Sequence, residues 1–207
     1  MAAWEKVKVN KGTYGVDLQS IADFESNLKD NLYKLWNRMS SGSYFPQAVV
    51  KSYLEPMSEP MFHEDSYGYR PGKSALDAVG VARERCWRND WCIDLDIKSF
   101  FDTVDHQLVM KAIRFHTEEK WIHLYVERWL KTPIQKEDGT LIERNSGISQ
   151  GGVTSPLLSN IFMHYVFDEW MKRQFPEVEF ERYVDDALVH CRSKRLAEKY
   201  WKQLKLD

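Results

Sequence analysis

The chain has 207 residues, of which 43% are hydrophobic and 14% aromatic, so it can bury one sizeable core or two small subdomains. It contains no apolar run of about 18 residues and no apolar centre of a secretory signal near its start, which predicts a cytoplasmic protein without a membrane segment. The formal net charge of −2 lacks the basic excess common in dedicated nucleic-acid binders. Three scattered cysteines without a CxxC pair predict reduced, mostly buried thiols rather than disulfides or a zinc site.

The spacing of apolar residues predicts helices first, and then strands mixed with helices. Ser74 and Asp77 form a capping-box pattern at the start of one helix, and Asp105 is placed as the N-cap of another. In chain order, the expected helices cover residues 17 or 20 to 39, 48–57, 74–87, 105–115, 117–131, 155–175 and 193–207, with a strand over 91–97 and hairpins over 132–147 and 180–191. This order predicts an α+β fold in which helices pack on one face of an antiparallel sheet.

Acidic residues interrupt two of the predicted strands. Residues 91–97 alternate between apolar and polar side chains, and Asp96 lies on the polar face. The stretch 180–191 is apolar except for a few charges, among them the adjacent Asp185 and Asp186. If the two strands pair, three carboxylates come together, and each raises the pKa of the others unless a cation lies between them. Oxygen ligands of this kind suit Mg²⁺, with Mn²⁺ as a second choice, and two such ions about 3.5–4 Å apart would serve a phosphoryl displacement.

Simpler interpretations compete for several of these residues. An adjacent pair of aspartates is by itself a weak signal, because most such pairs lie in turns. Asp94 is better explained as a solvated strand residue, and Asp102 as a turn residue. For the tryptophans, core packing is favoured over stacking on nucleic-acid bases; these are Trp87, Trp91, Trp121, Trp129 and Trp170.

Four segments in order resemble the boxes of a known family. They are SYGYRPGKSALDAV from residue 66, DLDIKSFFDTVDH from residue 94, GISQGGVTSPLLSNIF from residue 147, and RYVDDALV from residue 182. Together they are similar to the reverse transcriptases and maturases encoded by bacterial group II introns, and RYVDDALV resembles their YxDD box. The resemblance implies a polymerase palm, in which a primer 3′-hydroxyl attacks the α-phosphate of a deoxynucleoside triphosphate opposite an RNA template.

The resemblance also implies a role for each site residue. Asp96, Asp185 and Asp186 would be the catalytic metal ligands, and Phe101 would lie under the incoming sugar and exclude a ribose 2′-hydroxyl. The other residues implied to touch substrate are Ser99 and Phe100 through backbone N–H groups on the triphosphate, Gln150 and Gly151 in the nucleotide pocket, Tyr183 and Val184 near the primer end, and Arg70 and Lys73 on template or phosphates. Read without the resemblance, Arg70 and Lys73 belong to a loop that leads into a capped helix.

The chain also departs from the family pattern. Residues 1–85 are expected to form a helical, fingers-like region and residues 86–207 a palm, but the basic fingers hairpin is missing near residues 47–50 and the thumb has no counterpart. An alternative is therefore a catalytically weak or inactive RNA-binding or maturase module on the same scaffold; a nucleotide cyclase would carry a GGDEF-type turn in place of YVDD. Expected partners are template and primer RNA, dNTPs and the host intron RNA, and a homodimer is compatible with the sequence.

Overall fold

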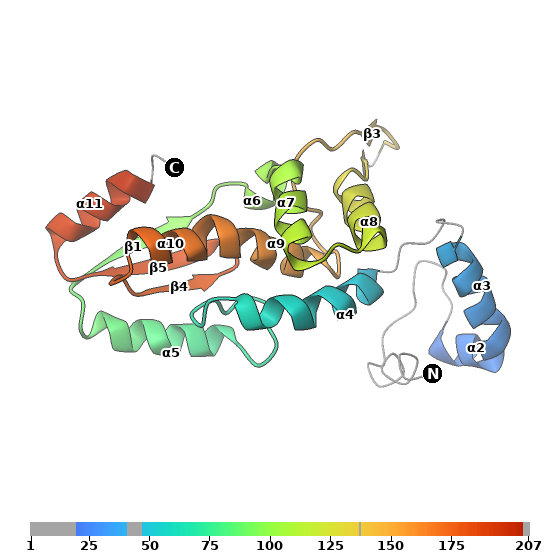
Figure 1. Ribbon diagram of the computed structural model, residues 1–207, viewed down its shortest axis with the longest axis horizontal. Helices are drawn as coiled ribbons and strands as arrows, with labels where there is room; N and C mark the ends of the chain where they lie inside the picture. The colour runs from blue at the N-terminus through green and yellow to red at the C-terminus, as the bar shows by residue number, and fades with distance from the viewer. Residues whose placement is uncertain (1–19, 41–46, 137, 205–207) are drawn as a thin grey trace. The chain divides into compact units, whose positions relative to one another are not determined.

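The computed structural model describes residues 20–40, 47–136 and 138–204 of the chain (Figure 1). The chain divides into two compact units, Met1–Pro46 and Gln47–Asp207. The division after residue 85 that was expected from the sequence falls inside the second unit and stays a prediction. All the candidate site residues belong to the second unit.

The described part of the first unit contains two helices, α2 (Ile21–Ser26) and α3 (Leu28–Ser40). Ser20 begins α2 with a capping box, in which its hydroxyl accepts the Asp23 N–H at 3.0 Å. The prediction of one continuous helix is wrong, because the backbone leaves the helical region at Asn27, with φ −134° and ψ 47°. The possible start of that helix at residues 17–19 lies outside the described residues.

The second unit alternates helices with short strands. In chain order it contains α4 (Gln47–Ser58), the 3₁₀ turn η1 (Glu59–Met61), α5 (Ala75–Cys86), β1 (Trp91–Asp96), α6 (Phe100–Thr103), α7 (His106–His116), α8 (Lys120–Leu130), β2 (Ile134–Gln135), β3 (Leu141–Ile142), α9 (Ser155–Met163), the π-helical segment η2 (His164–Asp168), α10 (Glu169–Gln174), β4 (Phe180–Tyr183), β5 (Asp186–Cys191) and α11 (Lys194–Leu204). The two predicted caps are confirmed: Ser74 and Asp77 form a capping box on α5, and Asp105 caps α7.

The central sheet is antiparallel and has the strand order β1-β5-β4 (Figure 1). The open edge of β4 is partly covered by a short parallel addition, in which Ser66 bridges to Arg182, the Tyr67 N–H donates to the Arg182 carbonyl at 2.8 Å, and the Arg182 N–H donates to the Asp65 carbonyl at 2.9 Å. The predicted α+β fold with an antiparallel sheet and packed helices is confirmed.

Helices pack on the sheet through residues that the strands bury. The Phe167 ring, from η2, meets the Phe180 ring of β4 edge to face at 5.3 Å between centroids. The predicted helix over residues 155–175 is interrupted by η2, so that its path is α9, η2 and α10. A further helix, α5, lies beside β4, where the Arg85 guanidinium donates to the Phe180 carbonyl at 3.0 Å. The hairpin with Asp138-Gly139 at its turn is also present, as β2 and β3.

Two expectations about single residue types are wrong. Trp87 is 73% exposed and Trp91 is 44% exposed, so neither is a core residue. Each indole instead lies under a cation, Arg83 for Trp87 and Lys194 for Trp91. The thiols of Cys86 and Cys92 are exposed, and only Cys191 is buried as expected. In the described part of the chain, every helix is too short or too polar to cross a lipid bilayer.

Candidate active site

The three predicted metal ligands meet at one end of the central sheet. Asp96 is the last residue of β1, and it lies directly opposite Asp186, the first residue of β5. Opposite residues in an antiparallel pair have Cβ atoms about 4.5–5.5 Å apart. Asp185 is the second residue of the two-residue turn between β4 and β5, and Asp186 follows it as the first residue of β5. The pairing expected from the sequence therefore forms, and it sets Asp96 and Asp186 side by side.

These carboxylates lack neutralising partners. Within the described residues, none of Asp96, Asp185 and Asp186 makes a side-chain hydrogen bond or an ion pair. Burial raises the pKa of Asp186 above its ordinary value, and the negative charges of Asp185 and Asp96 raise it further. The surroundings of Asp186 therefore disfavour its charged form, and a bound cation would offset this effect.

Arg182, in β4, is the one arginine or lysine in the described strands of the central sheet, and its charge is paired elsewhere. Its side chain is fully buried, and its Nε and Nη2 atoms donate to the two Asp168 carboxylate oxygens, both at 2.7 Å. This bidentate pair matches the planar guanidinium to the carboxylate. Arg182 therefore does not neutralise Asp185 or Asp186, and the need for a positive charge at the end of the sheet remains.

The three carboxylates border two different cavities. Asp96 and Asp185 border a mostly apolar cavity of about 430 Å³ that α10 and α11 also line. Asp186 borders a second cavity, of about 290 Å³, together with Asp94 and residues of α5. Among the described residues, no three acidic, histidine or cysteine side chains converge on one point where they could hold an ion. The oxygen donors suit Mg²⁺ in type and charge, and the structure brings them together in pairs.

The residues expected to bind the triphosphate lie in a loop that follows β1. Ser99 has a positive φ of 55°, and the Phe100 N–H already donates to the Ile97 carbonyl at 3.0 Å. The next residue, Phe101, is half-buried, and its carbonyl accepts the Ile148 N–H at 2.7 Å. This bond ties the loop to the segment that leads into Gln150.

Gly147 explains how closely these two segments approach. A Cβ at this position would lie 2.5 Å from the Phe101 carbonyl oxygen, and the φ of Gly147 is +88°, so both space and conformation require glycine. Further along, Gln150 and Gly151 are exposed, and Gly151 has a φ of +80°. The predicted nucleotide-pocket residues thus lie on a loop whose start is fixed against Phe101.

The residues expected near the primer lie at the YVDD turn. Tyr183 is half-buried, and its ring lies 6.0 Å from that of Tyr69. Val184 is 3% exposed and has a φ of 63°, which is unusual for a β-branched residue. The turn that carries Asp185 is therefore packed into the fold rather than free in solution.

Arg70 and Lys73 are engaged inside the protein. The Arg70 guanidinium donates to Glu59 at 2.9 and 2.7 Å and to the His63 and Ser66 carbonyls, both at 2.6 Å. Lys73 donates to the Glu64 carbonyl and lies 4.7 Å from the centre of the Tyr67 ring. These contacts fit the simpler interpretation of the loop, and a contact with template stays a prediction.

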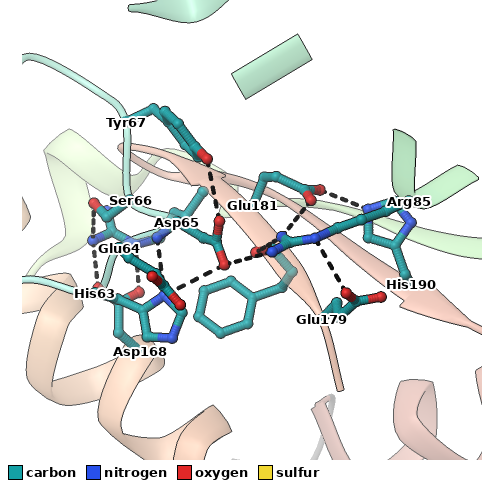
Figure 2. Close-up of polar contacts among 12 residues, drawn as sticks. His63, Glu64, Asp65, Ser66, Tyr67, Arg85, Asp168, Glu179, Glu181 and His190 are labelled. Carbon is teal, nitrogen blue, oxygen red and sulfur yellow. Dashed lines mark hydrogen bonds and ion pairs between the residues drawn. The ribbon is translucent and has the colours of Figure 1, made fainter. Parts of the chain in front are cut away.

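Sequence reasoning missed a network of charged side chains around Arg85 (Figure 2). Figure 2 shows Arg85 between Asp65, Glu181 and Glu179, with ion-pair distances of 2.8, 2.6 and 3.6 Å, and His190 against Glu181 at 2.6 Å. Burial raises the pKa of Tyr67 to about 12, and the neighbouring Asp65 adds to this effect. The signal in the sequence was Glu181-Arg182, two charges inside an otherwise apolar strand.

An antiparallel sheet with packed helices and unpaired carboxylates at one strand end is the arrangement of a polymerase palm. Residues 46–206 match the family described as "Reverse transcriptase (RNA-dependent DNA polymerase)", and the chain belongs to this family. Members of the family generally use divalent metal ions. The predicted resemblance to group II intron-encoded reverse transcriptases is thereby confirmed.

Similar proteins include two bacterial relatives and a solved structure. The chain is 31% identical over 165 residues to protein YkfC of Escherichia coli, covering 75% of this chain and 43% of YkfC. It is 26% identical to the group II intron-encoded protein LtrA of Lactococcus lactis, covering 95% of this chain and 38% of LtrA. The structure of apo telomerase from Candida tropicalis matches with a TM-score of 0.60 at 13% identity, over 90% of this chain and 38% of telomerase.

Two facts describe the lengths of these alignments. The chain spans about two fifths of the length of the curated relatives. The LtrA alignment runs over 231 positions, which exceeds the 207 residues of this chain, so gaps fall opposite it.

Proposed function

We propose that this chain is the palm of an RNA-directed DNA polymerase, which joins a deoxynucleotide to a primer 3′-hydroxyl on an RNA template. One observation carries the proposal: Asp96, Asp185 and Asp186 gather at one end of the sheet without a compensating charge. Membership of the reverse transcriptase family supports it. By contrast, the other acids that are buried against the sheet have arginine partners.

The three carboxylates would hold two Mg²⁺ ions. Such ions supply a lowered pKa for the primer hydroxyl and neutralise charge on the phosphoryl group. The protein's own part is to hold three oxygen-donating side chains at one end of the sheet. Of the candidate ligands, Asp96 and Asp185 are the pair that share a cavity.

The loops beside the sheet would hold the nucleotide. Phe101 is positioned by its bond to Ile148, and its ring would exclude a ribose 2′-hydroxyl. Gln150 and Gly151 are exposed, as a residue that receives a ligand must be. Tyr183 would approach the primer end. Positioning and electrostatics then account for most of the catalysis.

The partners implied by this function are an RNA template, a primer and dNTPs. One related structure is described as telomerase in complex with a fragment of telomeric RNA, and LtrA is a group II intron-encoded protein. A host intron RNA is therefore a reasonable template. Among the described residues no three metal-ligating side chains converge, and this favours a second candidate, in which the scaffold binds RNA without polymerising.

Primer extension on an RNA template with Mg²⁺ tests the proposal. We expect incorporation by the wild type, loss of incorporation in Asp185→Ala, and full incorporation in Asp90→Ala. Asp90 is a matched control because it is exposed and precedes β1 at the end opposite to Asp96. Equal incorporation by all three proteins would contradict the metal site.

Absence of incorporation in all three proteins would contradict polymerase activity. An RNA-binding titration at several salt concentrations then tests the second candidate. Binding that rests on phosphate contacts weakens steeply as salt rises. RNA binding that is equal in the wild type and Asp185→Ala would support the binding module.

A further inference from the structure

The turn that carries Asp185 is held in a conformation that it would not adopt alone. Val184 has a φ of 63°, and a β-branched residue in this left-handed region is strained by its own side chain. Strain of this kind persists only where the surroundings enforce it. Contacts to the turn must therefore come from elsewhere in the fold.

Arg182 supplies the first contact. Its Nη1 atom donates to the Val184 carbonyl at 2.8 Å, two residues further along the chain. The guanidinium cannot move, because Asp168 binds it through two hydrogen bonds and Ser66 accepts another at 2.8 Å. The carbonyl of the strained residue is thus fixed to a fully buried group.

Asn160 connects Arg182 to a distant segment. Its Oδ1 atom accepts from Arg182 Nη1 at 3.1 Å, and its Nδ2 atom donates to the Gly68 carbonyl at 2.6 Å. Asn160 is 1% exposed, and it lies in α9. The amide therefore links the backbone of the Ser66–Gly68 segment to the group that holds the turn.

Gly68 closes the arrangement by direct contact. A Cβ at this position would lie 2.5 Å from Val184 Cγ2, 2.8 Å from the Val184 nitrogen and 3.2 Å from the Tyr183 carbonyl carbon. The φ of Gly68 does not lie in the left-handed region, so its backbone conformation does not require glycine. What requires glycine is the close approach of the turn.

We propose that Gly68, Asn160 and Arg182 are positioning residues for the reaction, because together they fix the backbone of Val184 and thereby the directions of Asp185 and Asp186. The expected effect of these residues on catalysis rests on the proposed function. The claim that they fix the backbone of the turn does not. None of the three residues touches substrate in this assignment, since each acts through the turn.

Two glycine substitutions separate positioning from general folding. Gly68→Ala forces the turn to shift, whereas Gly80→Ala is a matched control in α5, where a Cβ meets nothing within 4 Å. We expect Gly80→Ala to keep wild-type incorporation with an equal or slightly higher Tm. Gly68→Ala should keep a cooperative unfolding transition but lower kcat at least tenfold, with a smaller change in the KM for dNTP.

A second substitution tests the contact itself. Val184→Ala removes the Cγ2 atom that a methyl group at position 68 would strike. The backbone contacts to the Val184 nitrogen and the Tyr183 carbonyl carbon remain, so the effect of Gly68→Ala is compared between two backgrounds. Gly68→Ala should lower kcat by a smaller factor in the Val184→Ala protein than in the wild type, and an equal factor in both would overturn the inference.

Amide hydrogen exchange of residues 183–187 gives a readout that does not depend on activity. We expect at least tenfold faster exchange in Gly68→Ala than in the wild type or Gly80→Ala. If the wild type incorporates nucleotides and Gly68→Ala matches it in rate and exchange, the positioning inference fails and the proposed function stands. If the wild type incorporates nothing, the proposed function fails, and unchanged exchange would still overturn positioning of the turn.

Discussion

The same sheet carries two groups of acidic residues that differ in their partners. The interior group consists of Asp65, Asp168 and Glu181, and each of them binds an arginine. The sheet-end group consists of Asp96, Asp185 and Asp186, which have no such partner within the described residues. The groups also differ in burial, because the interior three are buried whereas Asp96 and Asp186 are exposed and Asp185 is half-buried. Charges that are already matched stabilise the fold, and unmatched charges remain available to a ligand.

The pKa shifts follow the same division. Burial by itself would lower the pKa of Arg85, but hydrogen bonds to Asp65 and Glu181 raise it above its ordinary value. At the sheet end, burial and neighbouring carboxylates raise the pKa of Asp186. The interior contacts therefore favour the charged form of Arg85, whereas the sheet end disfavours the charged form of Asp186. Four substitutions sharpen this contrast.

The largest expected effect is on activity, in Asp96→Asn. The substitution keeps the shape of the side chain but removes one of the two carboxylates that border the shared cavity. We expect incorporation to fall at least about a hundredfold, as when a strong electrostatic contact to a transition state is lost. The free energy of unfolding should stay equal or rise, because repulsion is relieved. A fall in stability that matches the fall in activity would place Asp96 with the interior group.

The second substitution, Asp168→Asn, should act on stability. It leaves Arg182 buried and without its anionic partner, which typically costs about 3–5 kcal/mol. Urea unfolding measures the loss, with Asp90→Asn as the exposed control. A loss below about 1 kcal/mol would mean that the remaining hydrogen bonds of Arg182 suffice.

A smaller effect is expected from Asp186→Asn in buffer without divalent ions. Because the folded state raises the pKa of Asp186, its protonated form is favoured there, and the stability that protonation gives is lost as the pH rises through the raised pKa. The variant should therefore have a higher Tm than the wild type at pH 7 and the same Tm below the ordinary pKa of 3.8. Thermal unfolding across this range checks the sign, and a lower Tm at pH 7 would contradict repulsion at the sheet end.

The smallest effect is expected from Lys131→Gln. Lys131 binds Glu127 at 2.6 Å, but the two side chains are 62% and 47% exposed. Water and salt screen such a pair, so its removal should change the free energy of unfolding by less than about 0.5 kcal/mol. Urea unfolding of this variant beside Asp168→Asn compares an exposed ion pair with a buried one. Equal losses of unfolding free energy in the two variants would show that burial does not determine how much an ion pair contributes to stability.

The sequence predicted what depends on local pattern. The alternation of apolar and polar side chains predicted β1, and the capping residues Ser74 and Asp105 predicted the starts of α5 and α7. The pairing of Asp96 with Asp186 followed from two acidic strands in one sheet. These features rest on short-range preferences that a sequence displays directly.

The remainder depends on contacts between distant segments. The break at Asn27 has no strong helix-breaking residue to mark it. The role of Gly68 rests on its approach to Val184, and that of Asp168 on its pairing with Arg182. The resemblance implied that Arg70 contacts template or phosphates. In the fold its guanidinium binds Glu59 and two backbone carbonyls. No local pattern specifies such partners.

The π-helical turn at His164–Asp168 has a consequence for the tolerance of this protein to deletions. A π turn holds one residue more than the α-helical turn that it replaces. The extra residue is taken up within about one turn, so Asn160 and Asp168 both reach Arg182, although residues eight apart in a regular α-helix differ in direction by about 80°. Deleting one residue of the π turn would leave these two residues seven apart in a regular α-helix, still on one face, whereas inserting a residue into the flanking helix would separate them. The π turn thus allows one arginine to bind residues from both halves of this helix.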